Sequence, residues 1–514
     1  MSDNEFDPYR EAAFGAENML GVVRAPEIFR EGQTWFNVTE PLSLQHLEGR
    51  LVILDFWTFC CINCIHVAET LRKLEKAFPE EVVIVGVHSP KFDAEKDPQK
   101  LRQAILRYGI KHPVVHDPDR ELWEQYAIKA WPTLVFLSPQ GTVIGMHSGE
   151  PDLNEMLRAI NDVLDKFKVE GLIEPVELDT ERERAPHNRL SHPSKIKPLT
   201  LDGERYWALA DSGHSQIVLL NDHGEEVERY GNGRRGFVDG PAERARFRRP
   251  QGLICGDGTI YVADTGNHAI RVIDLNTDTV RTIAGTGERG LPLQAGETMG
   301  RETDLASPWD LALAEDQLYF ANAGTHQIGV FDLSDGTVRR VAGSGTEGLR
   351  DGKPDEAQLA QPSSLALTED EEMLIFVDAE TSAIRTIELA HNEQVGTLVG
   401  AGLFEFGHEN GKFAQARFQH PLAVTDGGER CLYVADSYND TIRIVDVMAG
   451  EVADFDDPDH PHGAFDCTDG TCSPLNEPAG IWADGEDRIL VVDTNNHRVL
   501  EYRLSQRNYR IWAN

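Results

Sequence analysis

The sequence lacks any long apolar run. None of its hydrophobic stretches reaches the roughly 20 residues that a membrane-spanning helix requires. The first 15 residues, MSDNEFDPYREAAFG, are acidic and do not contain the apolar core of a secretory signal. We therefore expect a cytoplasmic protein with no membrane partner.

Lysine is also scarce. It supplies only 13 of the 49 basic residues, against 86 acidic ones, and the net charge is −37. About −11 of this charge falls in residues 1–190 and about −26 in the remainder. So acidic a chain repels the phosphates of nucleic acid, and no nucleic-acid partner is expected. The acidity suits a salt-tolerant host or, equally, a generic soluble surface.

Cysteine occurs only seven times in 514 residues. In the cytoplasm, free thiols are expected rather than structural disulfides. Three of the seven, Cys60, Cys61 and Cys64, fall within the stretch LVILDFWTFCCINCIH. They can form a redox centre, a metal site or part of the core.

Strand-like and helix-like segments alternate after an N-terminal extension over residues 1–24. This alternation predicts an α/β domain with a mainly parallel central sheet over residues 25–168. The expected strands are 50–57, 81–89, 132–141 and 142–149, and the expected helices are 64–78, 97–109 and 151–167. The polar stretch 169–189 has no helical period and is interpreted as a linker.

From residue 190 to residue 514 the sequence repeats itself. The phrase YVADTGNHAIRVID returns five times in looser form, and an Asp or Asn marks each copy at spacings of 53 to 58 residues. A proline marks the start of each copy with the same period. The acidic or Asn markers are Asp211, Asp264, Asn322, Asp378, Asp436 and Asp493; the proline markers are Pro193, Pro250, Pro308, Pro362, Pro421 and Pro478. Two markers that keep one period over six copies predict a repeat architecture.

Each copy contains about four short β-rich segments, which predicts an all-β propeller of six four-stranded blades. A short carboxylate at the end of the second strand can accept backbone N–H groups in the turn that follows, so the recurrent Asp has a structural explanation. The Pro-x-Gly opening, YVAD, NH and IR of the copies resemble the NHL-repeat family. Asn322 and the segment AETS in the fourth copy depart from that pattern.

The pair Cys61–Cys64 forms a Cys-x-x-Cys between an expected strand and an expected helix. Unpaired N–H groups at a helix N-terminus stabilise a thiolate, which makes Cys61 the expected nucleophile. Cys64 is then the buried resolving thiol that closes the disulfide.

This region resembles the thioredoxin-like family through DFW before the motif and AWPTLVFLSPQG after it. The resemblance implies that Asp55 is the buried acid beneath the resolving cysteine and that Pro132 is a cis-proline facing the disulfide. Asp55 interrupts an apolar run, so it is a costly carboxyl that can take the proton of Cys64. The long insertion resembles the TlpA-like and peroxiredoxin-like branches; Thr58 fits a peroxiredoxin, but Leu54 does not.

Other interpretations of the cluster stay open. A zinc site needs four ligands, and Cys60, Cys61, Cys64 and His66 are crowded for a tetrahedron. Cys60 is either a packed thiol or an alternative disulfide partner. No cofactor or metal is expected here.

Three further features are weighed against plain structural roles. His460, His462, Cys467 and Cys472 are zinc-compatible residues in one loop, but a loop without metal is favoured. The repeated His268, His326 and His497 are attributed to packing or turn hydrogen bonds. Six arginines lie close together in the sequence of this acidic chain, and they form either an anion-binding site or a solvated loop. They are Arg234, Arg235, Arg244, Arg246, Arg248 and Arg249.

The order of the two domains, with FCCINC, SPWD and AGTHQI, resembles NHL-repeat proteins that carry a thioredoxin-like domain in front of the repeats. We expect a thioredoxin-like thiol–disulfide oxidoreductase whose propeller recruits a protein partner on one face. The alternative is a non-enzymatic scaffold whose cysteine pair is a redox switch or vestigial. A propeller hydrolase or lyase with a channel metal is disfavoured, because no inward carboxylate set is evident. The sequence predicts no oligomeric state.

Overall fold

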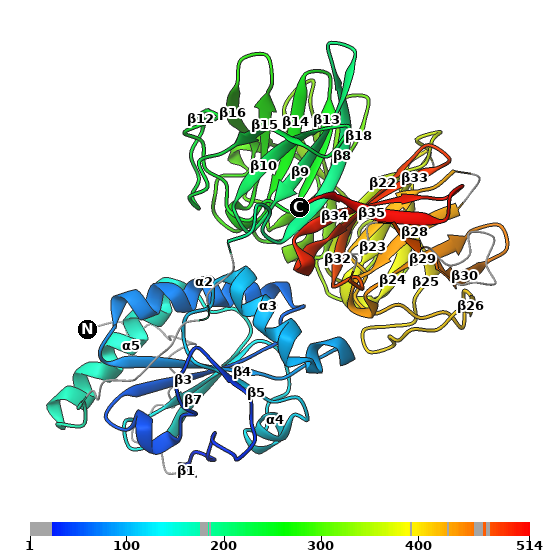
Figure 1. Ribbon diagram of the computed structural model, residues 1–514. Coiled ribbons are helices and arrows are strands. Elements are labelled where there is room, and N and C mark those ends of the chain that lie inside the picture. The colour runs from blue at the N-terminus through cyan, green and yellow to red at the C-terminus, as the bar shows by residue number, and fades with distance from the viewer. Residues whose placement is uncertain are drawn as a thin grey trace. The chain divides into compact units, whose positions relative to one another are not determined.

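A computed structural model describes residues 23–174, 183, 187–390, 393–428, 431–456, 466–468 and 473–514. The chain forms two compact units that divide between Pro186 and His187. The first contains the α/β fold and the second the propeller (Figure 1).

The first unit is built on a seven-stranded sheet in the order β1-β7-β6-β3-β4-β5-β2. Its strands are β1 Val23–Arg24, β2 Trp35–Phe36, β3 Leu51–Trp57, β4 Val82–His88, β5 Val114–His116, β6 Thr133–Leu137 and β7 Thr142–Ser148. The middle strands β3 and β4 are buried along their whole length, as their apolar runs predict.

The sheet is mixed, so the expectation of a mainly parallel sheet was wrong. Only β3, β4 and β5 run parallel, while β6 pairs antiparallel with β3 and β7 antiparallel with β6. The tight turn at Gly141, where φ is +77°, accounts for the antiparallel pairing of β6 and β7. A connection this short joins antiparallel neighbours, whereas parallel strands need a long crossover.

Helices cover both faces of this sheet. They are α2 Ile62–Ala77, α3 Pro98–Tyr108, α4 Glu121–Gln125 and α5 Leu153–Val169, with the 3-10 turns η1 Leu44–Leu47 and η2 Asp93–Lys96. Side chains of α2 and α5 share one core with β3, and α4 contributes to the core on the other face. Asp97 and Asp152 cap α3 and α5 by accepting backbone N–H groups. In the described part of the chain, no helix is long and apolar enough to cross a membrane.

The second unit confirms the six-bladed propeller: six separate sheets follow one another, each with four successive antiparallel strands. Blade one contains β8 Pro193–Leu201, β9 Glu204–Asp211, β10 Gln216–Asn221 and β11 Glu226–Tyr230, and blade two contains β13 Gly252–Gly256, β14 Thr259–Asp264, β15 Ala269–Asp274 and β16 Thr279–Ala284. Blade three contains β18 Pro308–Ala314, β19 Gln317–Asn322, β20 Gln327–Asp332 and β21 Thr337–Ala342, and blade four contains β22 Pro362–Leu367, β23 Met373–Asp378, β24 Ala383–Glu388 and β25 Gln394–Val399. Blade five contains β27 Ala423–Asp426, β28 Cys431–Asp436, β29 Thr441–Asp446 and β30 Glu451–Asp454, and blade six contains β32 Pro478–Asp484, β33 Arg488–Asp493, β34 Arg498–Arg503 and β35 Asn508–Ala513. Four blades carry a further short outer strand, β12 Gly240–Pro241, β17 Glu297–Met299, β26 Gly411–Lys412 and β31 Asp466–Cys467.

The recurrent carboxylate accepts a backbone N–H group. The donor does not lie in the turn that follows the carboxylate, where it was expected. Asp264 Oδ1 accepts from the N–H of Arg248, which lies 16 residues earlier on the way into the blade. Its Oδ2 binds Arg271 and the side chain of Asn267. All six markers repeat the backward bond at 2.7–2.8 Å, from donors 16 to 20 residues earlier. The carboxylate therefore ties the entry of each blade to its second strand.

A second repeated bond joins each blade to the next. His268 Nδ1 accepts the N–H of Ser307, the residue before Pro308 of the following blade, at 3.1 Å. The equivalent acceptors are Ser215, His326, Ser382, Asp440 and His497, and the six bonds measure 2.9–3.2 Å. This confirms the structural role expected for the repeated histidines. We call this bond the blade latch.

Among the described residues no strand is shared at the ring closure: β8 to β11 of blade one come from the start of the second unit, and β32 to β35 of blade six come from its end. The seam is held by the blade latch from His497 to the N–H of His192, at 3.0 Å, and by a core that contains Trp207 and Trp512. Arg488 lies over both indole rings and pairs with Asp222 at 2.7 Å. Apolar packing and an ion pair between the buried Arg488 and the partly exposed Asp222 thus join the two ends of the ring.

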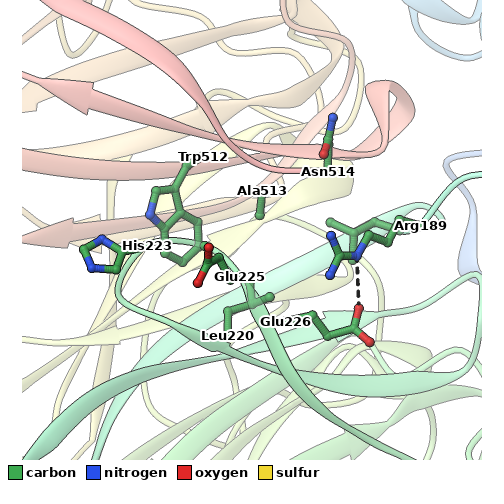
Figure 2. Close-up of a pocket in the computed structure, with 10 residues that line it drawn as sticks. Arg189, Leu220, His223, Glu225, Glu226, Trp512, Ala513 and Asn514 are labelled. Atoms are coloured by element: carbon green, nitrogen blue, oxygen red, sulfur yellow. Dashed lines mark ion pairs between the residues drawn. The ribbon is translucent and has the colours of Figure 1, made fainter.

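A small pocket of about 200 Å³ lies at this seam. Figure 2 shows Trp512 and Ala513 on one wall and Leu220 below them. Arg189 and Glu226 pair across the opening at 3.4 Å, so the charges there are already matched within the protein.

The latch at the seam yields a stability prediction. His497→Ala should lower the free energy of unfolding by about 1–3 kcal/mol, because it leaves the N–H of His192 without its acceptor. The matched control is His268→Ala, which removes the same latch inside the ring. The seam variant should cost at least as much, since His497 also packs edge-on against the His192 ring at 4.5 Å. Denaturant unfolding of the full chain measures both; an unchanged midpoint for His497→Ala alone would contradict closure by this latch.

Candidate functional site

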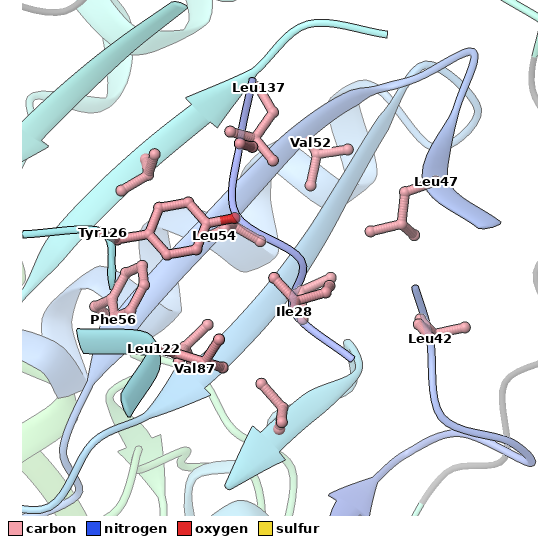
Figure 3. Packing of buried hydrophobic residues seen from close by; sticks show 14 of the residues in the cluster. Ile28, Leu42, Leu47, Val52, Leu54, Phe56, Val87, Leu122, Tyr126 and Leu137 are labelled. Atoms are coloured by element: carbon pink, nitrogen blue, oxygen red, sulfur yellow. The ribbon is translucent and has the colours of Figure 1, made fainter. Parts of the chain in front are cut away.

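The two faces of strand β3 carry different side chains: one face is apolar, and the other includes the carboxyl group of Asp55. Val52, Leu54 and Phe56 point into an apolar core with residues of α4 and β6 (Figure 3). Ile53 and its neighbour Asp55, by the alternation of side chains along a strand, face α2. The cysteine motif follows directly where β3 ends.

The two cysteines of the motif lie at the start of α2. Cys61 is the N-cap of the helix, with φ −76° and ψ 119°, and its side chain is partly exposed. Cys64 lies one turn further on and is only 2% exposed. The first thiol is therefore accessible at the helix N-terminus and the second is enclosed behind it.

Burial raises the pKa of the Cys64 thiol well above its usual value. A hydrogen bond with the Cys61 side chain and the nearby Asp55 carboxylate act in the same direction, and the backbone of Thr58 opposes them by donating to the sulfur. Cys64 thus holds its proton until a base removes it.

Asp55 lies close enough to Cys64 to contribute to the raised pKa of its thiol. It is 3% exposed, and burial raises its pKa to about 7, against a smaller opposing effect of His112. Its Oδ1 has no hydrogen-bond partner among the described residues. A carboxyl group that ionises near neutrality can exchange a proton with a neighbouring thiol under ordinary conditions.

The Trp131–Pro132 bond is cis, as predicted. Pro132 directly precedes β6, whose first residue, Thr133, pairs with Phe56 of β3. The Trp131 ring is fixed by a bond from Nε1 to the Ser89 carbonyl at 2.8 Å and by contact with Trp123 at 4.4 Å. Pro132 therefore lies at the edge of the sheet where β3 leads into the cysteine motif.

Sequence reasoning missed Glu95, a fully buried carboxylate in the insertion. It accepts the Thr58 hydroxyl at 2.6 Å and the Cys60 N–H at 3.1 Å, together with the N–H groups of Lys91 and Phe92. Thr58 and Cys60, in the segment that leads into Cys61, are therefore fixed to the insertion. No local signal marks Glu95, because it stands in a polar segment that looks exposed.

The Cys60 thiol is packed in the interior and is not exposed for a disulfide with another cysteine. It is 2% exposed and its sulfur lies 3.7 Å from the Thr58 hydroxyl. His66, the fourth candidate of the zinc interpretation, bonds Glu150 at 3.0 Å instead. Within the described residues, no three His, Cys, Asp or Glu side chains are grouped to hold a metal.

Two buried histidines behind the motif were also missed. His88 Nδ1 lies 3.2 Å from His116 Nδ1, and the ring of His88 stacks on Phe59 at 5.3 Å. Burial lowers the pKa of both imidazoles, that of His88 strongly. They are neutral near pH 7, so they place no charge behind the motif.

The other predicted constellations are described only in part or are partly buried. His460, His462 and Cys472 lie outside the described residues. Cys467 is in a disulfide, so the expectation of free thiols was wrong at this position, and Cys467 presents no thiolate. Of the arginine cluster, Arg249 is 7% exposed and its N–H forms a blade latch. The exposed members are Arg234, Arg235 and Arg244, which we call the arginine loop.

The innermost strands of the propeller carry charged groups that the sequence analysis did not single out. Lys195 of β8 is 3% exposed and donates to the carbonyls of Leu422 and Ala479, and burial lowers its pKa to about 8. Asp310 of β18 accepts the Ser364 hydroxyl at 3.0 Å. Protein groups thus satisfy both charges.

Comparison with known proteins agrees with this architecture. A family model described as thioredoxin-like matches residues 49–143. Human NHL repeat-containing protein 2 is 36% identical over 527 residues, covering 96% of this chain and 71% of the human protein. Protein SUPPRESSOR OF QUENCHING 1, chloroplastic, of Arabidopsis thaliana is 36% identical over 485 residues, covering 90% of this chain and 45% of that protein.

The thioredoxin-like unit also has relatives of its own. Thiol-disulfide oxidoreductase ResA of Halalkalibacterium halodurans is 26% identical over 113 residues, covering 21% of this chain and 60% of that protein. The match with the NHL repeat-containing proteins, by contrast, runs through both units. A thioredoxin-like domain followed by a six-bladed propeller, with this degree of identity, identifies the chain as a member of the NHL repeat-containing protein 2 family.

Proposed function

We propose that the protein is a thiol–disulfide oxidoreductase whose propeller recruits a protein partner. The observation that carries the proposal is the pairing of an accessible Cys61 at a helix N-terminus with a buried Cys64 beside Asp55. A scaffold would need neither a carboxyl group that titrates near neutrality nor an enclosed second thiol.

The reaction has two steps. The Cys61 thiolate attacks a substrate disulfide, so that one substrate sulfur leaves as a thiolate and a mixed disulfide forms. Cys64 then transfers its proton to the Asp55 carboxylate and attacks Cys61. The bond between Cys61 and the substrate breaks, the substrate leaves reduced, and a Cys61–Cys64 disulfide remains.

The recruiting surface is proposed on the propeller face that carries the arginine loop. Arg234, Arg235 and Arg244 are exposed, and Phe237 and Val238 between them are 38% and 40% exposed. A cationic surface with apolar side chains suits a partner segment that is acidic and partly hydrophobic.

Thiol reactivity tests the first step. In Cys64→Ser, Cys61 should alkylate at pH 7 at least about tenfold faster than Cys64 does in Cys61→Ser, because only Cys61 is both accessible and at the helix N-terminus. Site-resolved mass spectrometry separates these thiols from Cys60. Faster modification of Cys64 would reverse the assignment of nucleophile and resolving thiol.

The stability of the first unit should depend on Asp55 and pH. The native pKa of about 7 lies above the unfolded value of about 3.8, so between these values the native state binds more protons. Stability conferred by the protonated carboxyl is complete below pH 4 and is lost as pH rises through 7, by up to about 4 kcal/mol. Asp55→Asn should remove this loss. Hydrogen exchange of the β3 amides, corrected for intrinsic rates at pH 5 and pH 8, measures it; equal pH dependence in both proteins would refute the buried titration.

Partner trapping tests recruitment. Cys64→Ser should retain a mixed disulfide on Cys61, and replacing the three arginines of the arginine loop by Ser should weaken trapping of a protein partner several-fold at low salt. The matched control replaces three exposed arginines elsewhere, Arg281, Arg289 and Arg507. Reaction with a small disulfide should be unchanged in both. Equal trapping by the two triple variants would move recognition away from the arginine loop.

A further inference from the structure

Gly86 lets side chains of neighbouring segments approach the backbone closely in the middle of a buried strand. It lies in β4, in register with Asp55 of β3. A Cβ atom at this position would meet Trp57 Nε1 at 3.0 Å, Val114 at 3.2 Å and His112 Nε2 at 3.5 Å. Because paired residues of neighbouring strands point to the same face, Asp55 also borders this space. Three polar side chains therefore surround a position that carries no side chain of its own.

His112 is held in this place by its backbone. The side chain of Asn37, which is 2% exposed, donates to the carbonyls of Ile110 and His112 at 3.1 and 3.0 Å. Gly86 donates its N–H to the Pro113 carbonyl at 2.9 Å. The loop after α3 is thus fixed onto β4, with the imidazole above Gly86.

The polar atoms around Gly86 are buried and unsatisfied. Asp55, Trp57 and His112 are 3%, 3% and 6% exposed. Asp55 Oδ1, Trp57 Nε1 and His112 Nε2 make no hydrogen bond to any residue that the structure describes. Such groups are costly to bury, so their convergence calls for a functional explanation.

The other nitrogen of His112, Nδ1, is also buried and makes no hydrogen bond to a described residue, but it faces Glu75 of α2. His112 Nδ1 lies 3.4 Å from Glu75 Oε1 on α2, and the Glu75 side chain is 29% exposed. The charged and titratable groups around His112 are therefore Asp55 from β3 and Glu75 from α2, with Cys64 beyond Asp55. Arg72 of α2 is occupied by the carbonyls of Tyr108 and Gly109 and by Glu69.

We propose that His112 is a positioning residue of the thiol–disulfide reaction, which carries the Cys64 proton from Asp55 across Gly86 to Glu75 and solvent. The proposal rests on the proposed function and deepens it. It explains why a glycine stands in β4, since a side chain there would separate Asp55 from the imidazole.

The proton balance is simple. Asp55 takes the proton of Cys64 as the thiolate attacks the mixed disulfide. The Asp55 carboxyl passes the proton to His112 Nε2, and the imidazolium releases a proton from Nδ1 through Glu75 to water. Asp55 and His112 end in their starting states, and only the Cys61–substrate bond has been exchanged for the Cys61–Cys64 bond. The positive imidazolium also favours an ionised Asp55, in line with the lowering of the Asp55 pKa by His112.

The experiment uses the reduced full-length chain and Ellman's reagent, a small aromatic disulfide. Attack by Cys61 releases one thionitrobenzoate, and attack by Cys64 on the mixed disulfide releases a second. His112→Asn should slow the second release at least about tenfold at pH 7 and flatten its pH profile, while the first release stays unchanged. Gly86→Ala should act in the same direction, and Glu75→Gln, at the surface, should slow the second release about threefold.

Matched controls separate this role from a packing defect. His147→Asn makes the same change at a histidine of β7, two strands away from β3. Glu69→Gln makes the same change as Glu75→Gln on the same helix, at the partner of Arg72. Both should release the second thionitrobenzoate at the wild-type rate. In His112→Asn, carbon-13 titration of the Asp55 carboxyl should show a higher pKa than in the wild type.

The outcomes distinguish the two proposals. If the wild type releases only one thionitrobenzoate from the Cys61 site, the oxidoreductase function fails. If the wild type releases two, but folded His112→Asn and Glu75→Gln resolve at the wild-type rate at every pH, the His112 pathway is overturned and the oxidoreductase function stands. If His112→Asn does not fold, Glu75→Gln and Gly86→Ala decide the question alone.

Discussion

A buried carboxylate must be given hydrogen-bond donors, and much of this structure depends on how that requirement is met. In every blade but the third, a buried aspartate accepts a backbone N–H group from the segment that enters the blade. Each of these five aspartates also accepts from an arginine of its own blade: Arg229, Arg271, Arg385, Arg443 and Arg498. In the first unit, Glu95 meets the same requirement with three N–H groups and one hydroxyl. Each of these carboxylates joins segments that are distant in sequence, which is why removing a single oxygen would release more than one contact.

Asp55 departs from this pattern, because its Oδ1 accepts no hydrogen bond from a described residue. With one oxygen unsatisfied, burial is not offset, and the carboxyl group titrates near neutrality. The neighbouring Cys64 has its pKa raised by the same burial. Two acids that are both reluctant to ionise can pass one proton between them, and the pair carries a single negative charge before and after the transfer. Glu95 fixes the position of the loop before Cys61, so the rigid part of the site and its titrating part use different carboxylates.

Repetition in the propeller separates structural residues from candidates for recognition. The carboxylates, the blade latches and their prolines recur in all or nearly all blades, because each blade must be joined to the next in the same way. Residues that occur once are not required by this geometry. The arginine loop and the buried Lys195 belong to that class. A binding function is therefore more reasonably sought among the features that break the repeat.

The sequence by itself determined the order of the two folds, the six blades and the position of the cysteine pair. These are properties of local pattern: a period near 57 residues, and a Cys-x-x-Cys between a strand and a helix. The cis bond before Pro132 was also foreseen, through a family resemblance.

Only the tertiary structure decided which groups meet across the sheet. Glu95 reaches Thr58 over 37 residues, and Asn37 reaches His112 over 75, and no spacing rule announces either bond. The same holds for the mixed direction of the sheet and for the donors of the repeated aspartates, which lie before each marker rather than after it. Local sequence fixes backbone conformation over a few residues, whereas the pairing of buried polar groups depends on which segments the packed core brings together.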